Sequence, residues 1–69
     1  MIVSEKRAHD LGTPQEIAAY LHTTPGRLAQ MRHHATGPKY IRIGRRILYR
    51  WDDVREYLKA NTIDPQGIP

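Results

Sequence analysis

The sequence predicts a small, mainly helical domain that carries one β-hairpin. Two short amphipathic segments begin with Thr-Pro, at Thr13 and at Thr24, and this dipeptide is typical of a helix start. Residues 39–50 then form two runs rich in β-branched and aromatic residues around a glycine-containing turn, which indicates a hairpin. A third segment with helical periodicity begins near Trp51.

The composition limits the chain to one domain with a basic surface. Its 69 residues allow a single small core, and the absence of cysteine excludes disulfides and thiolate metal sites. Its 11 Lys and Arg residues outnumber the 7 Asp and Glu residues, which favours an anionic partner such as nucleic acid. A basic protein without such a partner is the alternative. No membrane span or secretory signal is recognisable, so we expect a cytoplasmic protein.

The first helix is expected to begin at Thr13 and to run to about His22. Thr13 and Glu16 have the spacing of a capping box, in which each side chain accepts from the other residue's backbone N–H. Leu11 is expected to fold over the first turn. The apolar residues of this helix share one face at helical spacing: Ile17, Ala18 and Leu21.

The second helix is expected from Pro25 to about His34, with Thr24 as its cap. Its predicted apolar face consists of Leu28, Met31 and Ala35. Two short helices separated by so tight a turn form a helix-turn-helix arrangement.

The hairpin is expected to pair residues 39–43 with residues 46–50. Ile41 and Ile43 share one face of the first strand, and Ile47 and Tyr49 share one face of the second. The third helix would follow, with Trp51 or Asp52 as its cap and an end near Asn61. Its expected inner face consists of Val54, Tyr57 and Leu58. We therefore divide the chain into a flexible N-terminal arm (residues 1–10), a domain (11–60) and a C-terminal tail (61–69).

This order of elements resembles the excisionase and MerR-like winged helix-turn-helix superfamily. The matching segments span much of residues 11–60: TPQEIAAYL (13–21), TPGRL (24–28), YIRIGRR (40–46) and WDDVREYL (51–58). Small phage excisionases, or recombination directionality factors, look most similar because they contain little more than this module. The chain departs from the MerR regulators, which continue into a long dimerisation helix, and it has Ala35 in a loop where the family often has glycine.

The resemblance implies a protein that binds double-stranded DNA and has no catalytic activity. A phage excisionase would bind attachment-site DNA cooperatively, bend it and direct integrase toward excision, in the cytoplasm of the host cell. We expect self-association on DNA through the arm and the tail, and a contact with integrase. A small transcriptional regulator, either a repressor or an activator, is the alternative function, and an adaptor that binds an acidic protein is a third.

The DNA-reading residues are expected on the second helix and on the hairpin, which would be the wing. Gln30 can pair with adenine, and Arg27 or Arg32 with guanine. Thr24 is first a helix cap and second a phosphate donor. The expected DNA-binding residues of the recognition helix are Thr24, Arg27, Gln30, Arg32, His33 and His34.

The expected wing residues are arginines, because arginine favours a narrow minor groove. They are Arg42, Arg45 and Arg46. The alternative is a charged turn that protects an edge strand from aggregation. Lys39 and Arg50 are expected to contact phosphates or to be plain surface charges.

No catalytic, metal or cofactor site is expected. The neighbouring His33 and His34 point about 100° apart on a helix, which does not suit one metal ion. The single serine, Ser4, lies in the predicted loose arm, so no Ser–His catalytic pair is expected. The chain has no Gly-rich phosphate loop, and no small-molecule ligand is expected.

Overall fold

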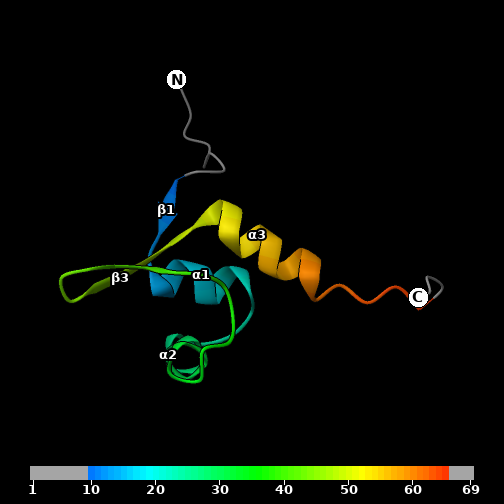
Figure 1. Ribbon diagram of the computed structural model, residues 1–69, viewed down its shortest axis with the longest axis horizontal. Helices are drawn as coiled ribbons and strands as arrows, with labels where there is room; N and C mark the ends of the chain where they lie inside the picture. The colour runs from blue at the N-terminus through cyan, green and yellow to red at the C-terminus, as the bar shows by residue number, and fades with distance from the viewer. Residues whose placement is uncertain (1–9, 66–69) are drawn as a thin grey trace.

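The computed structural model describes residues 10–65, which form three helices and a three-stranded antiparallel sheet (Figure 1). The fold is therefore a small mixed α/β domain, with one strand more than the hairpin that the sequence predicted. The elements are β1 (Leu11–Gly12), α1 (Pro14–Tyr20), α2 (Pro25–His33), β2 (Ile41–Ile43), β3 (Arg46–Arg50) and α3 (Trp51–Ala60). Most of the expected arm (1–10) and the end of the expected tail (61–69) lie outside the described residues.

The strand missing from the prediction is β1, which pairs with β3 and makes β3 the central strand of the sheet. Leu11 lies opposite Arg50 and is 45% exposed, so the expectation that it folds over the first turn of α1 was wrong. Gly12 is buried. A Cβ atom at Gly12 would lie 3.0 Å from Ile17 Cδ1 and 3.1 Å from the ring of Trp51. The missing side chain is what lets β1 pass this close to the core.

Both predicted helix starts are confirmed. The Glu16 N–H donates to Thr13 Oγ1 (3.1 Å), and the Thr13 N–H donates to Glu16 Oε1 (3.0 Å), which completes the capping box. Thr24 Oγ1 accepts from the Arg27 N–H at 3.1 Å and caps α2.

The ends of α1 and α2 fall slightly before the expected positions. In α2, the Ala35 N–H donates to the Arg32 carbonyl (3.1 Å) and the Thr36 N–H to the Met31 carbonyl (2.8 Å), which is the hydrogen-bond pattern of a Schellman motif. Ala35 has the left-handed conformation that this motif requires, with φ +57°. In α1, His22 has the equivalent position, with φ +60°. Neither helix end has the glycine that usually marks this motif.

The core lies where α1, α2 and α3 meet β3. Its buried residues are Ile17, Ala18, Leu28, Tyr49, Trp51 and Val54. Two residues that the sequence placed inside are exposed: Ala35 belongs to the helix-ending turn, and Leu58 is 39% exposed.

The start of α3 also differs from the prediction. The N-cap is Arg50, without a side-chain cap, and Trp51 is the first helical residue, so neither Trp51 nor Asp52 is the cap. β3 runs directly into α3, and the Trp51 N–H donates to the Asp10 carbonyl at 3.0 Å. This bond satisfies one of the first four N–H groups of the helix, which have no acceptor within the helix itself.

The hairpin has a two-residue turn, Gly44-Arg45, between the paired residues Ile43 and Arg46. Positive φ at Gly44 alone (+60°) matches a type II′ turn. The first strand is shorter than expected, because only residues 41–43 pair. Arg42 lies opposite Ile47, so these residues share the sheet face that packs on the helices.

Among residues 10–65, no helix is both long enough and apolar enough to cross a membrane.

Candidate nucleic-acid interface

The outer face of α2 carries polar and small side chains opposite the core. Leu28 is fully buried, and this fixes the rotation of the helix. Gly26, Ala29, Gln30 and His33 are exposed opposite Leu28, and Arg27 and His34 are exposed beside them. Because Gly26 and Ala29 are small, they leave room for a surface to approach the helix closely between the longer side chains.

The beginning of α2 carries one exposed hydroxyl group, that of Thr24. Thr24 is exposed, and its Oγ1 accepts the capping bond from the Arg27 N–H. A hydroxyl also carries one donor hydrogen, so Thr24 can cap the helix and donate to an anion at the same time.

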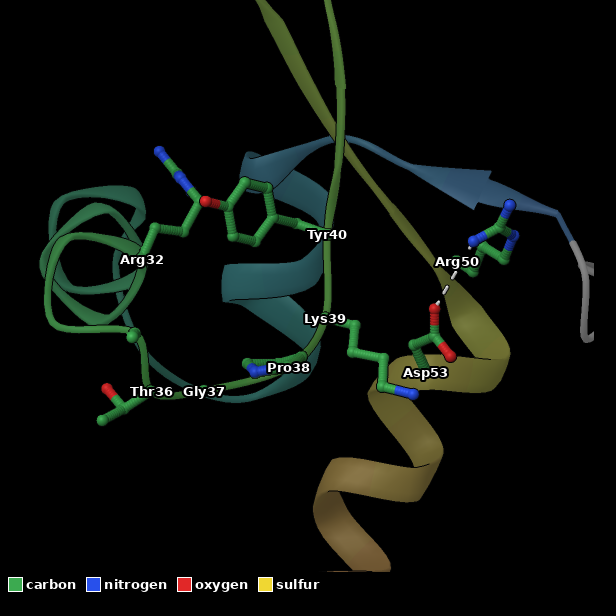
Figure 2. Close-up of a pocket in the computed structure, with 9 residues that line it drawn as sticks. Arg32, Thr36, Gly37, Pro38, Lys39, Tyr40, Arg50 and Asp53 are labelled. Carbon is green, nitrogen blue, oxygen red and sulfur yellow. Dashed lines mark ion pairs between the residues drawn. The ribbon is translucent and has the colours of Figure 1, made fainter.

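Arg32 has a different environment from the rest of the predicted set. It is only partly exposed, and its Nη1 donates to the hydroxyl of the fully buried Tyr49 at 2.7 Å. Its guanidinium carbon lies 5.7 Å from the ring centroid of Tyr40. Figure 2 shows Arg32 extending from α2 and Tyr40 extending from the segment before β2 toward it. Arg32 therefore ties α2 to the hairpin, and its spacing of four from Leu28 is the sequence signal for this inward position.

A hollow of about 430 Å³ lies between α2 and the hairpin, and we call it the helix–hairpin hollow. Its lining residues are Ala29, Arg32, His33, Tyr40 and Arg42. Tyr40, which the sequence analysis missed as a site residue, is 40% exposed there. The rings of His33 and His34 touch edge to face at 5.3 Å, but His33 alone of the two lines the hollow.

The hairpin arginines occupy two places. Arg45 lies in the turn and Arg46 begins β3, and both are exposed at the far end of the hairpin. Arg42 is exposed on β2 and lines the helix–hairpin hollow. The structure therefore separates the predicted set into a tip pair and a residue close to α2.

Lys39 and Arg50 lie beside Asp53 of α3. Both line a hollow of about 500 Å³ that also contains Asp53 (Figure 2). Arg32 and Tyr40 line this hollow as well as the helix–hairpin hollow, so the two hollows adjoin. Arg50 Nη1 lies 3.8 Å from Asp53 Oδ2, an exposed ion pair of small energetic value. An acidic neighbour makes this surface less suited to phosphate than the face of α2.

A third, more apolar hollow of about 420 Å³ lies between α1 and α3, lined by Glu16, Ala19, Tyr20, Trp51 and Arg55. Tyr20 and Trp51 meet there edge to face, with ring centroids 5.1 Å apart. Trp51 is buried, whereas Tyr20 is 46% exposed.

Within residues 10–65, no three His, Cys, Asp or Glu side chains are grouped so that they could hold a metal ion. Comparison of the chain with protein-family models, curated proteins and solved structures finds no match.

Proposed function

We propose that this protein is a winged helix-turn-helix module that binds double-stranded DNA sequence-specifically. The observation that carries the proposal is the outer face of α2, which presents Arg27, Gln30 and His33 opposite the buried Leu28. The hairpin stands next to this face, since Arg42 and His33 line the same hollow. A helix with exposed amide and guanidinium groups fits the major groove, and a neighbouring arginine-tipped hairpin fits the minor groove.

The position of each residue determines which part of the DNA it contacts. Gln30 pairs with adenine and Arg27 with guanine, because each can form two hydrogen bonds to the major-groove edge of that base. Arg45 and Arg46 enter the adjacent minor groove. Thr24 donates to a backbone phosphate from the start of α2. Lys39 and Arg50 have no part in this arrangement, since they lie with Asp53 beside α3.

The resemblance to small phage excisionases extends the proposal to site-specific recombination. One module of this size covers about 600–1,000 Å² of DNA-contacting surface, which gives modest affinity. Several copies on adjacent sites would raise the affinity and share one bent DNA path. Such an array next to an attachment site would favour the excisive assembly of integrase.

Equilibrium binding to a duplex selected from the native genomic neighbourhood tests the DNA-binding proposal. Replacing Arg45 and Arg46 by glutamine should weaken binding and reduce the slope of log K against log salt by about two, because each lost phosphate-neutralising charge contributes about 0.9. Gln30→Ala should relax the preference at one base pair by about 1–3 kcal/mol. Arg55→Gln, an exposed charge on α3, is the matched control and should change little.

Nuclease footprinting with excess competitor DNA tests the recombination role. Adjacent sites in one orientation, filled cooperatively with enhanced cleavage between them, support an excisionase. An inverted pair over a promoter supports the transcriptional regulator instead. Absence of any protection would refute DNA binding and leave an acidic protein as the partner.

A further inference from the structure

We propose that the helix–hairpin hollow is a phosphate-binding site that holds one phosphodiester group of the DNA backbone. The proposal rests on the proposed function and adds a ligand group to it. It also gives new roles to two predicted residues, since Arg42 becomes a phosphate ligand rather than a minor-groove residue, and Arg32 becomes part of the phosphate site rather than a reader of guanine.

The first argument is the chemistry of the lining. Apart from Ala29, each lining residue carries an N–H or O–H donor: Arg32, His33, Tyr40 and Arg42. No carboxylate lines this hollow. Arg32 and Tyr40 also line the hollow beside α3, which contains Asp53, whereas His33 and Arg42 line only the helix–hairpin hollow of these two. Two guanidinium groups in a lining that contains no carboxylate create a local positive potential, and a phosphodiester with its acceptor oxygens is the complementary group.

The second argument is that Arg32 is held in place before any ligand arrives. Its bond to the Tyr49 hydroxyl uses one of the five N–H donors of a guanidinium group. Tyr49 is fully buried, and its ring lies 6.3 Å from that of Tyr40, so the two tyrosines support the guanidinium from the core and from the hairpin. A donor fixed in this way loses little conformational entropy when it binds an anion.

The third argument is the position of the hollow between the two DNA-reading elements. In a duplex, the sugar–phosphate backbone separates the major groove from the adjacent minor groove. A protein that places α2 in one groove and the hairpin tip in the other therefore has the backbone between them. His33 reaches the hollow from α2 and Arg42 reaches it from β2. The small side chain of Ala29 leaves the hollow open on the helix side.

Neutral-phosphate scanning tests this site. Duplexes in which one phosphate at a time is replaced by an uncharged methylphosphonate are titrated with the wild-type chain and with the Arg42→Gln variant. At one position between the two grooves, either change alone should weaken binding about tenfold, and the two together should weaken it no further. His33→Gln and Tyr40→Phe should show the same non-additivity at the same phosphate. Lys39→Gln, in the hollow that contains Asp53, is the control. At every position, its effect on binding should add to the effect of the methylphosphonate.

The outcomes separate the two proposals. If Arg42→Gln weakens binding equally on every substituted duplex, Arg42 contacts no single phosphate and the phosphate site is refuted, while the proposed function stands. If Arg42→Gln instead changes the preference for base pairs in the minor groove, the residue acts there and the site is again refuted. If the unmodified duplex is not bound specifically, both proposals fail. Far-UV circular dichroism of each variant verifies that the fold is retained.

Discussion

Ala35 is the position where we expect a single substitution to stabilise the protein. It is exposed and has φ +57°, a conformation that costs an L-residue with a Cβ atom roughly 1–2 kcal/mol. Replacement by glycine removes this cost. The backbone bonds from Ala35 and Thr36 to α2 are unchanged by the substitution, and an exposed methyl group contributes little packing.

The expected gain is smaller than the relieved strain, because glycine is also more flexible in the unfolded chain. That flexibility costs about 0.4–1 kcal/mol. Ala35→Gly should therefore raise the free energy of unfolding by about 0.5–1 kcal/mol, which corresponds to several degrees in Tm for a domain of this size. Urea and thermal unfolding, followed by far-UV circular dichroism, measure both quantities.

Gly37→Ala is the matched control in the same turn. Gly37 has φ +83°, and an added Cβ would lie 2.8 Å from Met31 Sδ, so this variant should lose more than about 1 kcal/mol. An Ala35→Gly variant with unchanged or lower Tm would refute the reasoning, because it would mean that Ala35 is not held in the left-handed conformation in solution.

The remaining predictions concern the start of α2 and the passage of β1 over the core. Thr24→Ala should lower the free energy of unfolding by about 1 kcal/mol through loss of the cap, and Thr24→Ser should restore it in the same urea titration. Equal stability of the two variants would exclude a capping role. Gly12→Ala should cost about 1–3 kcal/mol, because its Cβ would press on Ile17 and Trp51. Gly26→Ala is the control, because its Cβ atom would lie 3.9 Å from its nearest neighbour, Thr24 Oγ1. This variant should not lower Tm.

Local signals made the helix starts readable from the sequence. The capping box at Thr13 and the Thr-Pro pair at Thr24 act within one turn, so their residues specify the structure without help from distant parts of the chain. The alternation in the second strand likewise predicted that Ile47 and Tyr49 share one face, and this face packs on the core. The exposed set on α2 followed from the position of Leu28, because a helix has a fixed angle per residue.

The features that the sequence did not reveal depend on tertiary contacts or on unusual residues. The turns that follow α1 and α2 contain left-handed His22 and Ala35, where no glycine marks the helix end. β1 has two residues, too few to show an alternating pattern. The inward position of Arg32 depends on its hydrogen bond to Tyr49, which is distant in the sequence. The spacing of four residues from the buried Leu28 was the only local signal for this position.

The pairing of β1 with β3 makes the fluorescence of Trp51 a measure of whether the N-terminal strand is docked. Gly12 lies against the indole of Trp51, the chain's only tryptophan, and the Trp51 amide is bonded to the Asp10 carbonyl. Departure of β1 would hydrate the indole and release that amide, even while the remaining helices stayed packed. Tryptophan emission therefore follows the docking of the N-terminal strand, whereas circular dichroism follows the helices. A difference between the two unfolding curves would reveal that the strand detaches first.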